Sequence, residues 1–487
     1  MRSKLMKWTL STHRVLGAIL SLFLLMWFGT GMVMLYHDYP RVGDKEVPHQ
    51  PALTIADLEQ LPTIIEAKPN ITAIELTSHM GKSVLNITSG GEQIELDAQS
   101  GNAILQPVTL EEVCKHVQQA WQVPIKKEKV MKRLDVWTPF PTNLQHLPLY
   151  CLTLDDKVGT ELYYSSQTGE LLQYTTRIER FWSWIGPIPH YFYITPLRQN
   201  RNLWMQTVVW IAGLGSVMCL AGLIVGLVMY YKVWRHKHRI RTPYRRPYYL
   251  KWHHIFGMIA GLFTFLFIFS GALSFSNMPE ILKKKQQDPA LSTLIQSNGL
   301  LQTATLQSDM PQLLMAFPKE VKRLGAYTFG DSMYYSITTD EGKKYYQVCN
   351  GKVTPHQLTM EEVKAYIDGL QLQHSYTIDL QEQYDSYYYA RKARVPELPV
   401  YKICLNNPDE TRIYIQPESG KIITRDAAWY ANTFVYPRIH TYQFGSFLNN
   451  HESIRRGIIW IILIAGAVIS ITGVQLSVRY IRRKLRW

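Results

Sequence analysis

The stretch STHRVLGAILSLFLLMWFGTGMVM, residues 11–34, decides the architecture of this chain, because its pattern returns in KWHHIFGMIAGLFTFLFIFSGALS at residues 251–274. His13 aligns with His253, 240 positions later. Two glycine pairs follow the same offset: Gly17 with Gly257, and Gly31 with Gly271. Each stretch is apolar beyond its histidine and is close to the ~20 residues that cross a hydrocarbon core. A membrane helix that begins beside a histidine is therefore predicted twice.

The charge of the chain points to a membrane. The formal net charge of the 487 residues is +14, and residues 230–254 contain eight Lys or Arg and no acid. Basic residues also cluster at the N-terminus and in the tail 479–487, so each cluster borders an apolar segment. This placement is typical of the cytoplasmic flanks of membrane helices and not of a nucleic-acid groove, so no nucleic-acid partner is expected. Four spans are predicted, at 15–36, 205–230, 255–276 and 457–478.

These spans predict a membrane α-helical protein with four transmembrane helices and two large loops on the outer face. If the basic segments lie inside, both termini are cytoplasmic. The predicted parts are 1–36 (first membrane helix with cytoplasmic N-terminus), 37–204 (first outer lobe), 205–230 (second helix), 231–254 (basic cytoplasmic loop), 255–276 (third helix), 277–456 (second outer lobe) and 457–487 (fourth helix and basic tail).

The repeat continues through the loops. VTLEEVCKHVQQ at 108–119 matches LTMEEVKAYIDG at 358–369, and ELYYSSQTGELL at 161–172 matches RIYIQPESGKII at 412–423. The first pair predicts amphipathic helices opened by a Thr–Glu capping box, and the second predicts strands joined by glycine turns. We therefore expect an internal duplication with one α+β lobe per half, arranged about a pseudo-two-fold axis along the membrane normal.

These motifs, together with the helix openings HRVLG and HHIFG and the pre-helix segments IPH and RIH, resemble the PepSY-associated transmembrane family. That family includes iron-regulated inner-membrane proteins and di-haem ferric-siderophore reductases. The resemblance covers nearly the whole chain and implies PepSY-like periplasmic lobes on a bacterial cytoplasmic membrane protein. In the family's second helix opening Arg usually follows His, whereas His254 follows His253 here, which leaves open which of the two has the family's role.

Two histidine pairs are related by the repeat: His13 with His253, and His190 with His440. Two imidazoles on opposing helices can give the two axial bonds of a haem iron, and the absence of C-x-x-C-H predicts b-type haem. We therefore expect two haem b groups, one near each membrane face. The plainer interpretation is that these are interfacial residues that bind no cofactor. The alternative ligands are His254 for the inner site, and His37 and His451 for the outer site.

Two functions remain open. In the first, a haem-containing reductase passes electrons from a cytoplasmic or quinol donor to a periplasmic ferric siderophore or other ferric chelate. In the second, a non-enzymatic PepSY-domain protein binds a peptide, protease or envelope partner without haem. No catalytic triad is apparent, and the spans lack the buried acids of a transporter. An even number of cysteines in each lobe permits the disulfides Cys114–Cys151 and Cys349–Cys404.

Overall fold

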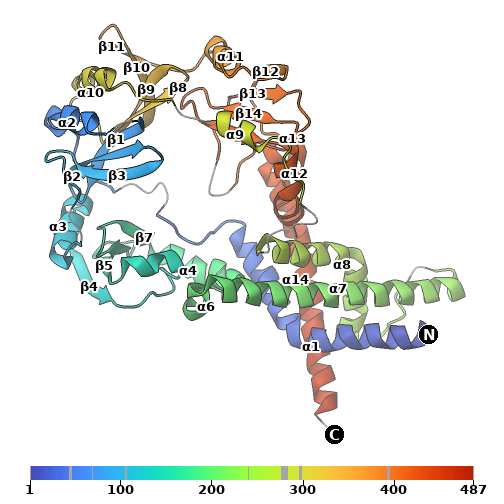
Figure 1. Ribbon diagram of the computed structural model, residues 1–487. Helices are drawn as coiled ribbons and strands as arrows, with labels where there is room; N and C mark the ends of the chain where they lie inside the picture. Colours follow the sequence, from blue (N-terminus) through green and yellow to red (C-terminus); the bar gives the residue numbers. More distant parts are fainter. Residues whose placement is uncertain are drawn as a thin grey trace.

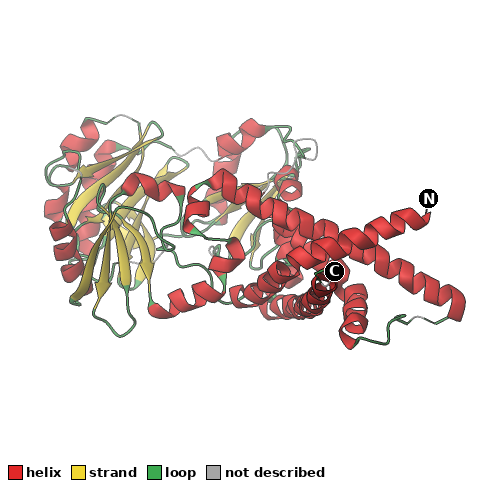
Figure 2. Ribbon diagram, turned by 90° about the horizontal axis from the view of Figure 1, so that it is seen from below, coloured by secondary structure: helices red, strands yellow, loops and turns green. Residues whose placement is uncertain are grey.

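The structure, a computed structural model, describes residues 2–42, 47–68, 70–104, 107–239, 241–275, 283–295, 299–391 and 395–485. Four long helices lie at one end of the molecule and the β-sheets at the other (Figures 1 and 2). All four helices are long and apolar enough to cross a membrane, which agrees with the four predicted spans. They are α1 (Arg2–Met34), α7 (Arg201–Lys237), α8 (Tyr248–Phe275) and α14 (Glu452–Lys484).

The helices extend beyond the apolar segments from which they were predicted. Helix α8 begins at Tyr248, so His253 and His254 lie inside it and not in the expected loop 231–254. Likewise His13 lies well inside α1. Lys and Arg are good helix formers, and they are favourable near the C-terminus of a helix such as α7, so the basic flanks continue the helices. Residue 276, where the third span was expected to end, is outside the described residues.

Each membrane helix packs against two others. Helices α1 and α8 both contact α7 and α14, so α1 and α8 lie diagonally across the bundle. The buried side chains between the four helices come from all of them and include Leu24, Phe28, Ala212, Ile268 and Leu463. Histidines that point inward from α1 and α8 therefore face each other across the centre.

The strands form three antiparallel sheets. One four-stranded sheet belongs to each half of the chain, and a seven-stranded sheet combines strands from both halves. The seven-stranded sheet has the order β11 (Lys352–Pro355), β10 (Gly342–Cys349), β9 (Ser332–Thr339), β8 (Arg323–Phe329), β1 (Ile71–His79), β2 (Lys82–Ser89) and β3 (Glu92–Asp97). The others are β4 (Ile125–Met131), β5 (Leu149–Leu154), β6 (Glu161–Ser165) and β7 (Leu171–Thr175), and β12 (Tyr376–Gln381), β13 (Val400–Leu405), β14 (Arg412–Ile415) and β15 (Ile422–Arg425).

The pairing of β1 with β8 joins the two lobes, which belong to different halves of the chain. Glu75 pairs with Gly325, 250 positions later, and its neighbours pair in antiparallel register around this point. Reciprocal backbone bonds lie beside the sheet: Leu53 N donates to Val321 O (2.7 Å), and Leu301 N donates to Ile71 O (2.8 Å). The two halves thus contact each other both within the sheet and beside it. In Figure 1 the sheets form an arch whose two ends stand on the helices.

The two predicted amphipathic helices are present. Helix α3 (Leu110–Trp121) and helix α11 (Met360–Gly369) each begin with a complete Thr–Glu capping box, at Thr109 and Thr359. The predicted turns contain Gly169 and Gly420, whose φ values of +71° and +62° favour glycine. All five cysteines are free, so neither permitted disulfide is formed.

Shorter helices connect the sheets to one another and to the bundle. In the first half they are η1 (Ile55–Leu58), α2 (Leu61–Glu66), η2 (Pro141–His146), α4 (Arg177–Ile185), α5 (Pro187–Tyr191) and α6 (Thr195–Gln199). In the second half they are α9 (Pro289–Ile295), α10 (Thr303–Ala316), α12 (Ala427–Asn432), η4 (Val435–His440) and α13 (Gly445–Asn450). Helix α5 carries His190 and the π-helical segment η4 carries His440, so both predicted outer ligands lie on short elements between a lobe and the bundle.

Candidate functional site

The histidines predicted for the inner site are neighbours. The ring centres of His13 on α1 and His253 on α8 are 6.0 Å apart, with 43° between the ring planes. His13 Nδ1 lies 2.9 Å from Met218 O on α7, and His253 Nδ1 lies 3.1 Å from Ile469 O on α14. Each histidine of a diagonal helix is thus fixed by the backbone of a helix beside it.

These bonds determine where the ring protons lie. A backbone carbonyl only accepts hydrogen bonds, so Nδ1 donates in both neutral rings and Nε2 keeps its lone pair. His253 Nδ1 also lies 3.1 Å from Thr472 Oγ1, a hydroxyl that donates to carbonyl oxygens of its own helix. Among the described residues, Nε2 of neither His13 nor His253 has a hydrogen-bond partner. The geometry thus leaves on each ring the nitrogen that would bind a metal.

A glycine lies against each ring, and at His13 only a glycine leaves enough room. A Cβ on Gly222 would lie 2.6 Å from His13 Cε1, which is closer than real contacts allow. Gly473 has the same relation to His253, with a corresponding distance of 3.6 Å. Each glycine stands four residues after the carbonyl that holds the ring, so carbonyl and glycine lie on one face of the helix.

His254 faces a different part of the bundle. Its ring stacks on Tyr230 of α7 with centres 4.7 Å apart, and Tyr244 lies edge-on at 5.2 Å. Both ring nitrogens are buried without a hydrogen-bond partner among the described residues. The structure therefore brings His253, and not His254, beside His13.

The outer histidines are held by side-chain hydroxyl groups of the membrane helices. His190 Nδ1 lies 3.0 Å from Thr30 Oγ1 on α1, and His440 Nδ1 lies 3.1 Å from Ser270 Oγ on α8. Both hydroxyls donate to a carbonyl of their own helix, so they accept from the imidazoles. Each ring also lies against the next residue of that helix, a glycine (Gly31 or Gly271).

Thr30 and Ser270 were not identified from the sequence. They could have been found, because they lie 240 positions apart and each directly precedes a glycine of the aligned pairs. His440 Nδ1 is also 3.2 Å from Phe267 O. Burial lowers the pKa of His440 to about 4, which keeps its ring neutral, as a metal ligand must be.

The two alternative outer ligands make other contacts. His37 stacks on Trp182 with ring centres 4.2 Å apart and 4° between the planes. His451 stacks on Phe447 at 4.5 Å, and its Nδ1 lies 2.8 Å from Phe447 O within the same short segment. These contacts hold both rings against neighbouring aromatics, whereas those of His190 and His440 hold them against membrane helices.

The inner histidines fit a metal that takes two ligands from the protein and its other ligands from a cofactor. Within the described part of the chain, no group of three or more His, Cys, Asp or Glu side chains is placed to hold a metal ion. The inner site offers two neutral imidazoles in an apolar bundle, the donor set of a bis-histidine haem. Gly222 makes room for one of these donors, because any side chain at this position would clash with the His13 ring.

Four membrane helices that carry α+β extramembrane lobes define the class of this protein: a multi-pass membrane protein with a large domain outside the bilayer. Residues 73–312 match the family described as PepSY-associated TM region, which supports the family that the sequence motifs resemble. The matched segment runs from β1 through α7 and α8 to α10, so it includes the link between the two halves. No curated protein matches the chain.

Proposed function

We propose that this protein is a membrane-bound haem reductase that passes electrons across the bilayer to a ferric complex. The observation that carries the proposal is the His13–His253 pair. Imidazole–metal bonds are about 2 Å long, so two imidazoles that would hold one metal ion must stand within a few ångströms of each other. The observed separation of the ring centres is 6.0 Å. In this proposal His13 and His253 hold the inner haem b, and His190 and His440 hold the outer one.

The hydrogen bonds that hold the histidines repeat between the two halves of the chain, which favours a duplicated architecture. His13 donates to the carbonyl four residues before a glycine of α7, and His253 does the same on α14. The hydroxyl contacts of His190 and His440 repeat in the same way on α1 and α8. We infer that the two halves arose by duplication and face each other about a two-fold axis, as in other parallel membrane repeats.

The charge distribution supports an orientation in the membrane. The basic segment 230–254 and the C-terminal basic residues lie at the ends of helices away from the sheets (Figure 1). By the positive-inside rule these ends are cytoplasmic, so the lobes project into the periplasm of a bacterial inner membrane. The inner pair then lies toward the cytoplasm and the outer pair toward the lobes.

This arrangement assigns a task to each part of the chain. Haem supplies one-electron transfer when it is bound. His13 and His253 position the inner group to receive electrons from a cytoplasmic or quinol donor, and His190 and His440 position the outer group beneath the lobes. The substrate is a ferric siderophore or another ferric chelate, whose iron is held less tightly after reduction. No acid–base residue is required for this chemistry.

The proposal is tested by the visible spectrum of the protein purified in detergent. We expect a Soret band, and a sharp α band after dithionite reduction, with about two haems per chain by pyridine haemochrome assay. Addition of ferric citrate to the reduced protein should restore the oxidised spectrum. A colourless preparation that cannot be reconstituted with haem would contradict the proposal and would favour a membrane-anchored binding protein for a peptide, protease or envelope partner.

A further inference from the structure

Four arginines gather in the second lobe where it meets η4. They are Arg391, Arg412, Arg425 and Arg438, named here the arginine cluster. Among the described residues, none of the four forms an ion pair with a carboxylate. Their guanidinium groups instead lie over aromatic rings: Arg412 over Tyr387 (3.6 Å), Arg425 over Trp429 (4.5 Å), Arg438 over Tyr430 (4.1 Å) and Arg391 over Tyr389 (5.4 Å).

Arg438 is the most unusual member, because its side chain is only 1% exposed. Its Nη2 donates to Ser386 O at 2.6 Å, but Nε and Nη1 are buried without a hydrogen-bond partner among the described residues. Burying a cation is costly unless an anion or several acceptors compensate it. Aromatic faces compensate only part of that cost. Arg438 is therefore a buried cation that aromatic rings and one carbonyl compensate only in part.

The cluster is continuous. Tyr387 and Tyr430 stack with ring centres 4.8 Å apart, so Arg412 and Arg438 cover the two outer faces of one tyrosine pair. Tyr389 lies between Arg391 and Arg438, with guanidinium carbons 5.4 and 5.6 Å from its ring centre. Burial, followed by repulsion from Arg391, lowers the pKa of Arg425. Positive charge thus runs from the exposed Arg391 to the buried Arg438.

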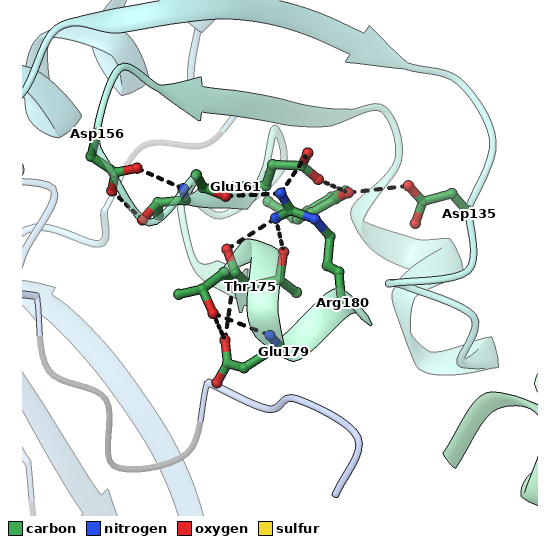
Figure 3. Close-up of polar contacts among 10 residues, drawn as sticks. Asp135, Asp156, Glu161, Thr175, Glu179 and Arg180 are labelled. Carbon is green, nitrogen blue, oxygen red and sulfur yellow. Dashed lines mark hydrogen bonds and ion pairs between the residues drawn. The ribbon is translucent and has the colours of Figure 1, made fainter. Parts of the chain in front are cut away.

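At the equivalent place in the first lobe, an arginine is paired with a carboxylate. There Arg180 Nη2 lies 3.4 Å from Glu161 Oε1, and Nη1 donates to Thr175 Oγ1 (Figure 3). Glu161 occupies the position that Arg412 has in the matched strand of the second lobe.

Other parts of this network are common to both lobes. Tyr163 donates to Asp135, and Tyr414 donates to Asp385, 250 positions after Asp135. The position equivalent to Arg438 is Ile188. The first lobe also holds one arginine among aromatic rings, Arg198, whose Nε and Nη1 are likewise buried without a partner among the described residues. What distinguishes the second lobe, among the described residues, is that four arginines over aromatic rings gather in one place.

The cluster is close to the outer histidine. Arg438 and His440 lie on the same short segment, η4, two residues apart. His440 contacts Ser270 on α8, while Arg438 contacts Ser386 and the rings of the second lobe. An anion bound at the cluster would therefore sit on the lobe side of the element that carries His440.

We propose that the arginine cluster binds the anionic oxygens, carboxylate or catecholate, of the ferric chelate that the protein reduces. Arg391 makes the first contact, and Arg438 supplies the buried charge that the anion compensates. Anion binding at the cluster stands on the geometry alone, and the identification of the anion as the substrate rests on the proposed reductase function. Charge-assisted bonds from guanidinium to carboxylate are strong, and Arg presents them in a fixed fork.

The test measures equilibrium binding to the purified full chain by quenching of tryptophan fluorescence. The probes are ferric citrate, which is anionic, neutral ferric tris(acetohydroxamate) and inorganic phosphate. Arg391→Gln and Arg438→Gln are compared with Arg133→Gln, an exposed arginine of the first lobe. We expect the two cluster variants to bind ferric citrate about tenfold more weakly or worse, the scale of one lost hydrogen bond to a charged group. Arg133→Gln should bind ferric citrate with the native affinity. All three variants should bind the neutral complex as the native protein does.

Unchanged ferric citrate binding in Arg391→Gln would overturn the proposal, and since Arg391 is exposed this result does not depend on whether Arg438→Gln folds. Equal affinity of the native protein for phosphate would overturn the substrate assignment. Haem content, measured on the same samples, distinguishes failure of the reductase function from failure of the anion site. If a haem-free protein binds citrate in an arginine-dependent way, the reductase function is refuted but the anion site is not. A haem protein with no arginine-dependent binding refutes the anion site alone.

Discussion

The inner and outer histidine pairs differ in what holds the imidazoles. The inner rings donate to backbone carbonyls of Met218 and Ile469, which belong to long membrane helices. The outer rings donate to hydroxyls of Thr30 and Ser270, and the rings themselves lie on short elements between lobe and bundle. One pair is thus supported by the main chain of the bundle, and the other by side chains that a single substitution can remove.

This difference indicates how each site can be changed. A helix carbonyl cannot be deleted by mutation, so the inner site can be altered only through its histidines or through Gly222, which makes room for His13. The hydroxyls at the outer site are themselves donors to helix carbonyls, and they are replaceable. Because hydrogen bonding at Nδ1 tunes the basicity of the coordinating nitrogen, the two sites should respond to different mutations.

The largest effect is expected from removal of an inner histidine. His13→Ala or His253→Ala should lose about half of the bound haem, because each variant lacks one of the two residues that would hold the inner group. The remaining haem should keep its spectrum, since the contacts of His190 and His440 lie elsewhere. Pyridine haemochrome assays and reduced-minus-oxidised spectra measure both. If neither variant lowers the haem content, the inner ligand assignment is wrong.

A pair of glycine substitutions tests the inner site without touching a ligand. Gly222→Ala would place a methyl group 2.6 Å from His13 Cε1 and displace the ring from Met218 O, whereas Gly473→Ala would place it 3.6 Å from His253 Cε1, an ordinary contact. Alanine is the better helix former, so neither change harms the helix itself. We expect Gly222→Ala to lose most of the inner haem and Gly473→Ala to retain it. Equal retention in both would refute the tight contact at Gly222.

Much of the fold could be predicted from the sequence because the deciding features are local. Apolar length and basic flanks predict the four membrane helices, and Thr–Glu capping boxes predict α3 and α11. The seven-stranded sheet could not be predicted, because β1 and β8 are separated by two membrane helices and neither strand contains a signal for its partner. Pairing at such long range is decided by packing and not by local pattern.

The candidate site divides in the same way. The repeat in the sequence identifies His13, His253, His190 and His440 as candidate ligands. It does not show which of the adjacent His253 and His254 faces His13. Consecutive helical residues point about 100° apart, so the choice depends on the rotation of α8 against its neighbours. The structure resolves it through contacts with α14 on one side and with Tyr230 of α7 on the other.

A smaller effect is expected at the outer site. Thr30→Val removes the hydroxyl that accepts from His190 Nδ1 and keeps the shape of the side chain. A less basic imidazole stabilises ferric iron less, so the midpoint potential of the outer haem should rise while haem content stays near the native value. Thr207→Val is the matched control, because Thr207 donates to a carbonyl of its own helix four residues earlier but makes no described contact with a histidine. Redox titration that gives the same potentials for Thr30→Val and Thr207→Val would contradict the role of the hydroxyl.

The smallest effect is expected from His254, and it sharpens the choice between the adjacent histidines. His254→Phe keeps a ring that can stack on Tyr230 and removes two ring nitrogens that are buried without a described partner. Because an unsatisfied buried polar group destabilises a fold, the thermal midpoint should stay the same or rise, and the haem content should not change. His253→Phe should instead lose the inner haem. If His254→Phe loses haem and His253→Phe does not, the rotation of α8 described here is wrong, and His254 is the inner ligand.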